Sequence, residues 1–193
     1  MKPDRKTEIV SISATLFKEK GYSAVTMRDI AQAMNIKAAS LYNHIRSKHE
    51  ILILIIIAIA EEYTHTISDI VDSDENAVEK LKKVIELHID ITVRNPEALA
   101  SLNNDWMHLP APELAYFLKM REQYEEMFRS IVKKGIADGE IKSHNPEVII
   151  FSMLSTLRTL YLWYGKKKDF NAKVLKDNLS EVLLHGIIWS LVV

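Results

Sequence analysis

The chain has 193 residues, of which 48% are hydrophobic and 26% charged, enough apolar content for one large domain or two small ones. It contains no cysteine, which excludes disulfides and thiolate metal sites. Its net charge of −1 hides an asymmetry: residues 1–50 carry nine Lys and Arg against five Asp and Glu, whereas residues 51–193 carry 16 against 21. A basic N-terminal part on an acidic remainder is what a nucleic-acid-binding head needs. The basic N-terminus lacks the apolar stretch of a secretory signal, so we expect a cytoplasmic protein.

Two helices are predicted near the N-terminus. The first covers 4–20, where apolar residues recur at helical spacing, and it ends at Gly21. Thr26 is the N-cap of the second, and Asp29 at the third helical position completes a capping box.

A tight turn and a third helix follow. Asn35 stands where the chain needs a left-handed turn residue, a conformation that Asn tolerates well. The third helix is expected over 38–45, polar on one side, with Leu41 and Ile45 pointing inward. Two short helices joined by a tight turn, with polar groups gathered on the second, are the layout of a helix-turn-helix that places a recognition helix in the DNA major groove.

The rest of the chain reads as helical, without strand alternation. Ile51–Ala60 is an apolar run of ten residues, whereas a bilayer span needs about 20, so we expect a buried helix and no membrane partner. Ser47 and Glu50 form a capping box in front of this run. We predict an all-α fold whose six further helices cover 48–71, 75–94, 96–108, 112–138, 146–164 and 171–191.

The run from Leu16 to Ile51, LFKEKGYSAVTMRDIAQAMNIKAASLYNHIRSKHEI, resembles the TetR family of bacterial transcriptional regulators. The resemblance implies an N-terminal helix-turn-helix domain over 1–47 and a larger six-helix ligand-binding and dimerisation domain over 48–193. It departs from the family pattern at the turn and in the recognition helix, where Lys37 replaces a capping Ser. The base preference of relatives therefore does not carry over.

The DNA-contacting residues are expected on the second and third helices. Thr26 and Arg28 lie at a helix N-terminus, where backbone amides and the helix dipole favour a phosphate. The groove-facing set is expected to comprise Lys37, Ala38, Ser40 and Asn43, side chains that can read base edges. By resemblance, the DNA backbone is contacted by Tyr42, His44 and Lys48. The alternatives are a surface histidine at 44 and a packing role for Tyr42.

The last two predicted helices carry broad apolar stripes, which the resemblance interprets as the interface of a homodimer on a palindromic operator of double-stranded DNA. The stripes could instead be internal core. The dimerisation set is Leu157, Leu175, Leu179, Leu183 and Ile187.

The middle helices combine a few polar groups with aromatic and Met side chains, as small-molecule sites do, although such residues can also be plain core. The candidates are Tyr63, His88, Asn103, Trp106, Met107, Tyr116, Met120, Tyr124, Arg158 and Tyr161. Arg158 is a cation in an otherwise apolar helix, where it could pair with a ligand carboxylate or phosphate, or with a neighbouring acid.

The C-terminal third, including the Leu-Tyr-Leu-Trp-Tyr of residues 160–164, is similar to TetR members that respond to acyl-CoA thioesters or govern fatty-acid catabolism. The resemblance implies a repressor that an acyl-CoA or a long apolar acid releases from DNA. The alternatives are an efflux regulator responding to hydrophobic drugs and a constitutive architectural DNA-binding protein. Enzyme motifs are absent, the seven histidines lack metal-ligand spacing, and no cofactor is expected.

Overall fold

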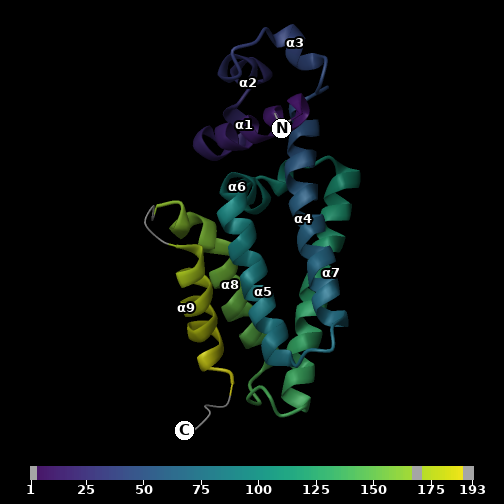
Figure 1. Ribbon diagram of the computed structural model, residues 1–193. Helices are drawn as coiled ribbons and strands as arrows, with labels where there is room; N and C mark the ends of the chain where they lie inside the picture. The colour runs from purple at the N-terminus through teal and green to yellow at the C-terminus, as the bar shows by residue number, and fades with distance from the viewer. Residues whose placement is uncertain (1–3, 167–170, 189–193) are drawn as a thin grey trace. The chain divides into compact units, whose positions relative to one another are not determined.

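The computed structural model describes residues 4–166 and 171–188. Within these ranges the chain forms nine α-helices and two short 3-10 helices, so the all-α prediction is confirmed (Figure 1). Their bounds are α1 Arg5–Lys20, η1 Tyr22–Ala24, α2 Met27–Ala33, α3 Ala38–Tyr42, α4 Lys48–Asp72, α5 Ala77–Arg94, α6 Pro96–Asn104, η2 Trp106–His108, α7 Ala111–Ala137, α8 Pro146–Tyr164 and α9 Ala172–His185.

Two helices end earlier than the sequence pattern predicts. The recognition helix α3 stops at Tyr42, and a turn carries the chain to α4. The segment predicted as one helix over 96–108 breaks at Asp105 and continues as the tighter η2. Apolar spacing marks which face of a segment is buried, but it does not mark where the backbone changes from α to 3-10 geometry.

The last helix also differs from its prediction over 171–191. Within the described residues α9 ends at His185, with Gly186 as its C-cap. The carbonyl of Ile187 then accepts a hydrogen bond from the backbone N–H of Lys142 at 2.7 Å, and Ile188 pairs with Ile141 in an isolated antiparallel bridge. This long-range pairing replaces the next helical turn. Residues 189–191 of the predicted helix lie outside the described ranges.

The described chain packs as two compact units. Unit 1 takes the residues up to Glu61 together with Asn95–Lys119, and unit 2 takes Glu62–Arg94 together with the residues from Met120 on. Each unit therefore combines two stretches of the sequence. The division expected from the sequence, between residues 47 and 48, separates parts by function and stays a prediction.

Unit 1 has its core between α1, α2, α3 and α6. Helix α1 packs against both α6 and α2, and α2 packs against α3. Ile9, Phe17 and Ile30 are almost fully buried. An ion pair between Lys18 and Glu97, 3.1 Å from Nζ to Oε1, also connects α1 with α6. The helix-turn-helix therefore belongs to the same compact unit as α6.

Unit 2 is organised around α5, which packs against α8 and α9. Its core includes Leu81, Ile85 and Phe128, all with almost no exposed surface. Gly135 of α7 allows a close approach here, because a Cβ at this position would lie 2.6 Å from the Cβ of Ala77. Any side chain there would overpack the contact between α7 and the start of α5.

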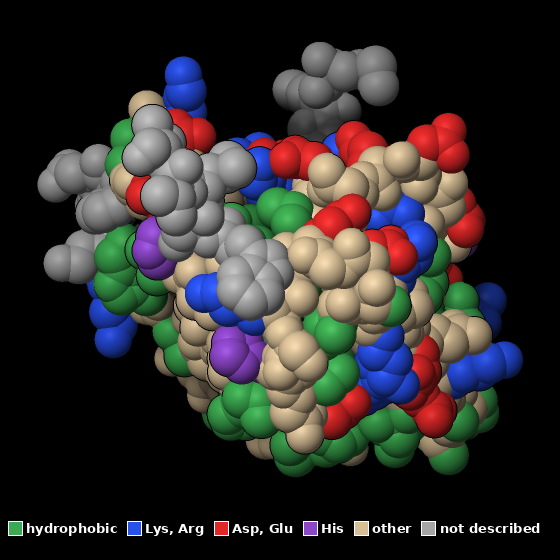
Figure 2. Space-filling view, turned by 90° about the horizontal axis from the view of Figure 1, so that it is seen from below, with side chains coloured by type: hydrophobic (Ala, Val, Ile, Leu, Met, Phe, Trp, Pro, Cys, Tyr) green, Lys and Arg blue, Asp and Glu red, His purple; other side chains and the backbone are tan. Residues whose placement is uncertain are grey.

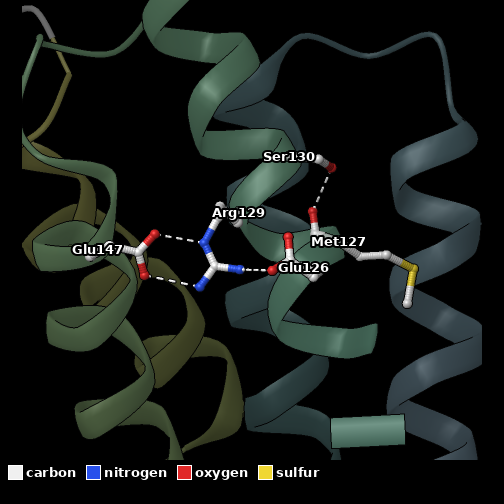
Figure 3. Close-up of polar contacts among 5 residues, drawn as sticks. All are labelled: Glu126, Met127, Arg129, Ser130 and Glu147. Carbon is white, nitrogen blue, oxygen red and sulfur yellow. Dashed lines mark hydrogen bonds and ion pairs between the residues drawn. The ribbon is translucent and has the colours of Figure 1, made fainter. Parts of the chain in front are cut away.

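The surface mixes charges of both signs. On the face shown in Figure 2, Lys and Arg side chains lie beside Asp and Glu side chains, with hydrophobic side chains between them. One such pairing connects α7 with α8 in unit 2: Arg129 holds both carboxylate oxygens of Glu147, at 2.6 and 2.9 Å, and also contacts Glu126 (Figure 3). These carboxylates raise the pKa of Arg129, and the hydrogen bonds that Arg129 donates to Glu147 contribute most. The two-bond pairing of Arg129 with Glu147 fixes the orientation of α7 and α8 more than it adds stability, because Arg129, Glu147 and Glu126 are all reached by solvent.

Helix α4 is, among the described residues, the one helix long and apolar enough to cross a membrane by length and composition alone. A helix buried in a protein core passes the same test. In the first two turns of α4, Ile51, Leu52, Ile55 and Ile56 are each at most 2% exposed. This burial supports the core helix that the sequence predicts.

Candidate nucleic-acid interface and effector core

The N-terminus of α2 is fixed by reciprocal bonds between Thr26 and Asp29. The Thr26 hydroxyl oxygen accepts from the backbone N–H of Asp29 at 3.2 Å, while the Asp29 carboxylate accepts from the backbone N–H of Thr26 at 2.7 Å. The predicted capping box is therefore confirmed. The hydrogen bonds from the side chain and backbone of Thr26 lower the pKa of Asp29. Thr26 thus has a role inside the protein, and its DNA contact stays a prediction.

The turn between α2 and α3 has the conformation that the sequence indicates. Asn35 has φ of 54°, so the left-handed turn residue is confirmed. The backbone N–H of Ile36 donates to the carbonyl of Ala31 at 3.0 Å and closes the turn. Lys37 is the N-cap of α3 without a side-chain bond to the helix, as its replacement of the usual capping Ser implies. The Lys37 ammonium has no acceptor to offer the helix N–H groups, and its side chain is exposed.

Helix α3 and the turn after it present one buried and one exposed side. Leu41 and Ile45 are 0% and 1% exposed, as predicted. The residues predicted to contact DNA are mostly exposed, with Tyr42 at 53%, and only Ala38 and Lys48 among them are half-buried. The exposed members are Thr26, Arg28, Lys37, Ser40, Tyr42, Asn43 and His44.

A shallow hollow of about 500 Å³ lies between α2 and the start of α3. It brings together three of the predicted DNA contacts, Arg28, Lys37 and Ala38, although nine residues separate the two cations in the sequence. Two exposed cations beside a helix N-terminus provide the charge and the hydrogen-bond donors that a phosphate accepts.

Lys48, by contrast, directs its ammonium group into the protein. Nζ donates to the carbonyls of Tyr22 and Val25, each at 2.8 Å, and lies 3.4 Å from that of Ser23. It also lies 4.3 Å from the centre of the Tyr22 ring. Burial lowers the pKa of Lys48. The DNA contact that the family resemblance implies for Lys48 stays a prediction, while the structure gives its three hydrogens acceptors in the loop between α1 and α2.

The ring of Tyr22 joins this loop to η2 within unit 1. It stacks on the imidazole of His108, with centroids 5.1 Å apart, and meets Phe17 edge-on at 5.0 Å. The nearby Asp105 has its pKa raised by burial. Sequence reasoning missed the contacts of Tyr22 with His108 and Asp105, because they join positions more than 80 residues apart and no local motif marks them.

Four of the predicted ligand-binding residues belong to unit 1: Asn103, Trp106, Met107 and Tyr116. The Trp106 ring lies 6.0 Å from that of Phe117. Tyr116 is exposed and donates to Glu61, and Asn103 donates to the carbonyl of Leu99 in its own helix. Their ligand contacts stay predictions.

The other six belong to unit 2, and three of them meet. His88 Nε2 lies 2.8 Å from the Tyr124 hydroxyl, and the Tyr63 ring lies 4.6 Å from the imidazole. Met120 and Tyr161 are buried as well. Arg158 donates to Glu125 at 2.6 Å, so its partner in the structure is a neighbouring acid, one of the two possibilities that the sequence left open.

The predicted dimerisation residues pack against the core of unit 2. Leu157 and Leu175 are buried, and Leu179, Leu183 and Ile187 are half-buried against the same core. On the same two helices other apolar side chains are exposed, including Phe151 at 72% and Val182 at 70%. The contacts of the predicted dimerisation residues with a second protomer stay a prediction.

Two family profiles match the chain. The profile "Bacterial regulatory proteins, tetR family" covers residues 9–55, and the profile "Tetracyclin repressor-like, C-terminal domain" covers residues 74–187. The chain belongs to the TetR family. The helix-turn-helix of this TetR protein and most of its remaining helices are thus accounted for by one family.

Relatives span almost the whole chain. The HTH-type transcriptional repressor KstR2 of Rhodococcus jostii is 26% identical over 188 residues, which are 96% of this chain and 92% of that protein. The structure of the ketosteroid transcriptional regulator KstR2 of Mycobacterium tuberculosis has a TM-score of 0.91 at 22% identity and covers 98% of both chains. The structure of AibR in complex with isovaleryl coenzyme A and operator DNA has a TM-score of 0.78 at 21% identity and covers 93% of this chain and 97% of that one.

The two structural likenesses show the fold, and the family shows the class of activity. This TetR protein is a DNA-binding transcriptional regulator, and its family acts by binding rather than by catalysis. Homodimers and ligand binding are typical of that family.

Proposed function

We propose that this TetR protein is a cytoplasmic, homodimeric repressor that an apolar effector of the acyl-CoA class releases from a palindromic operator. The observation that carries the proposal is the exposed side of α3. Leu41 and Ile45 anchor this segment in unit 1, while Lys37, Ser40 and Asn43 remain exposed for base edges. Arg28 and Tyr42 supply phosphate contacts, which fix the register of α3 on the duplex.

The dimer forms through apolar side chains that the protomer leaves exposed. On α8 these include Phe151 and Leu162, with Ser155 and Thr159 at helical spacing between them, and on α9 they include Val182. Two copies of this face would bury apolar surface that is otherwise in water. A dimer would place two copies of α3 about one DNA turn apart, ~34–36 Å, and read a palindrome.

The effector class is supported by the apolar character of unit 2 and by the relatives. Tyr63, His88 and Tyr124 provide a polar cluster enclosed by apolar side chains, the combination that small-molecule sites use. AibR was solved with isovaleryl coenzyme A and operator DNA, and KstR2 is named as a ketosteroid regulator. Isovaleryl coenzyme A carries a thioester carbonyl on a short apolar acyl chain, and a ketosteroid carries a ketone on an apolar ring skeleton.

Helix α4 connects effector binding with DNA release. It begins at Lys48, directly after the helix-turn-helix, and ends at Asp72 in unit 2. An effector that prefers the position of α4 in the DNA-incompetent state shifts the population toward that state. The helix-turn-helix domains of the two protomers then move apart, and the operator is released.

The first part of the test is operator binding. An operator is selected from random duplex DNA by the purified protein, and its affinity is measured by fluorescence anisotropy. Tyr42→Ala is expected to weaken binding about fivefold or more, the loss of one good hydrogen bond and its packing. Tyr42→Phe is the matched control that keeps the ring, and sedimentation checks that both variants keep the mass of the wild type. Unchanged affinity in Tyr42→Ala would remove α3 as the recognition helix.

The second part is release. Decanoyl-CoA is expected to dissociate the wild-type protein from this operator, and free CoA at the same concentration is expected to leave it bound. Release by hydrophobic drugs but not by decanoyl-CoA would show an efflux-type regulator. Binding that no effector alters would show an architectural protein.

A further inference from the structure

Helix α5 carries three buried polar side chains: Lys80, which donates to the carbonyl of Val71, and His88 and Thr92 further along the helix. His88 and Thr92 lie four residues apart, so their side chains are neighbours along the helix. His88 is 4% exposed and Thr92 is fully buried. Within the described residues, neither Nδ1 of His88 nor Oγ1 of Thr92 has a hydrogen-bond partner. Buried polar atoms are nearly always paired, so two orphans on one face indicate a missing partner.

Thr92 differs from other helical threonines of this chain. Thr15, Thr156 and Thr159 each donate to the carbonyl four residues earlier, at 2.8 to 3.3 Å. That bond is the usual way for a helical hydroxyl to satisfy itself. These three residues are exposed, whereas Thr92 is buried and makes no such bond. Its hydroxyl is therefore left for a partner from outside the helix.

The orientation of His88 is fixed by aromatic neighbours in unit 2. Nε2 bonds the Tyr124 hydroxyl at 2.8 Å, and the Tyr63 ring lies against the imidazole at 4.6 Å. Tyr63 and Tyr124 also meet edge-on, with centroids 5.7 Å apart. Because one ring nitrogen of His88 is held by Tyr124, the other is presented at a fixed angle from the far side of the ring.

The electrostatics of this place favour an uncharged group. Burial, with a smaller contribution from Arg158, lowers the pKa of His88 to about 3, so the imidazole is neutral near pH 7. Neutral imidazole offers one donor or one acceptor at Nδ1, and a threonine hydroxyl offers both. Arg158 is already paired with Glu125. A carboxylate brought to His88 and Thr92 would lose its hydration without gaining an unpaired cation.

We propose that His88 and Thr92 bind an uncharged oxygen of the effector, a ketone, ester, thioester or hydroxyl on an apolar skeleton, with Tyr124 positioning His88. This inference rests on the effector-binding role proposed above and narrows the ligand chemistry. It separates an acyl thioester, whose carbonyl is neutral, from the free acid of the same chain. The carboxylate of the free acid is charged, whereas this site holds only neutral donors and acceptors, so the acid binds less well.

The test uses the full-length protein and three probes of equal chain length: methyl octyl ketone, decanol and decanoate. Calorimetric titration is expected to show binding of the ketone or the alcohol, with decanoate about tenfold weaker or more. Equal or tighter binding of decanoate overturns the proposal, and so does the absence of binding by both neutral probes.

Thr92→Val tests the residues, because valine keeps the shape and removes the hydroxyl. Removing an unsatisfied hydroxyl is expected to raise the thermal midpoint of the free protein by about 1–3 °C. The same change is expected to weaken the neutral probe about three- to tenfold. Thr156→Val is the matched control, an exposed threonine for which probe binding should stay unchanged. A lower midpoint in Thr92→Val would show that an ordered water satisfies the hydroxyl, and would overturn the proposal.

Tyr124→Phe provides a second variant that keeps the core filled. It removes the hydroxyl that orients His88, and the preference for the neutral probe over decanoate should shrink. The outcome is separable from that of the proposed function. If decanoyl-CoA fails to release DNA while the ketone still binds in a Thr92-dependent way, only the acyl-CoA assignment falls. If decanoyl-CoA releases DNA while Thr92→Val changes no probe affinity, only this inference falls.

Discussion

Named polar groups beside the helix-turn-helix are paired within the protein, whereas in the core of unit 2 the described residues include two polar side chains, His88 and Thr92, that each keep an unbonded atom. Thr26 and Asp29 hydrogen-bond each other, and the Lys48 ammonium donates to carbonyls of the loop between α1 and α2. His88 and Thr92 keep a nitrogen and a hydroxyl oxygen unbonded among the described residues. The bonds of Thr26, Asp29 and Lys48 hold the start of α2 and the loop before it in place, which preserves the geometry of the exposed face, although the buried hydroxyls of Ser13 and Tyr22 are also unbonded among the described residues. In unit 2 the unbonded nitrogen of His88 and the hydroxyl of Thr92 can bond a ligand, as the few polar groups of a small-molecule site do.

Among the variants that test this comparison, Lys48→Met is expected to have the largest effect. The variant leaves the carbonyls of Tyr22 and Val25 without their charged donor, and we expect the free energy of unfolding to fall by about 2 kcal/mol. Operator affinity should fall with it, because the loop positions α2. The slope of affinity against salt concentration should stay nearly unchanged, since Lys48 gives its hydrogens to the protein.

Lys37→Met is the matched control. Lys37 is exposed and makes no cap bond, so its loss should leave stability nearly unchanged and reduce the salt slope by about one phosphate contact. If Lys48→Met behaved in this second way, Lys48 would be a direct DNA contact and the contrast between the two lysines would fail.

The next effect is the pH dependence contributed by His88. Its pKa is about 3 when folded and 6.5 when exposed, so between these values the unfolded chain binds more protons. Stability therefore falls as the pH falls below 6.5, by about 1.4 kcal/mol per pH unit, or about 2 kcal/mol between pH 6.5 and 5. Denaturant unfolding at both pH values measures this loss. His88→Gln should show a correspondingly weaker decline, and an equal decline in both proteins would mean that His88 titrates normally.

The smallest effect is expected at the cap of α2. Thr26→Ala removes the side-chain acceptor for the N–H of Asp29 and should lower the free energy of unfolding by about 1 kcal/mol. Thr26→Ser keeps the hydroxyl and should restore most of the loss in a urea titration. A loss in operator affinity larger than the loss in stability would indicate that Thr26 also contacts DNA.

The elements predicted well share one property, which is that their signals lie within one helical turn. The capping box at Thr26 and the left-handed Asn35 each involve residues at most three positions apart. Local backbone chemistry decides such features before any tertiary contact forms. The ends of α3 and α9 were less predictable. The end of α9 depends on pairing with a segment more than 40 residues away.

The sequence by itself determined the all-α class, the helix-turn-helix and its exposed polar set. Only the tertiary structure decided which partner each buried or half-buried polar group takes. It pairs Arg158 with Glu125 and Lys48 with the loop carbonyls, and among residues 4–166 and 171–188 it provides no partner for one atom each of His88 and Thr92. It also decided which apolar residues of α8 and α9 face outward. The physical reason is that composition and helical spacing fix what a face carries, whereas burial and pairing depend on which distant segment packs against it.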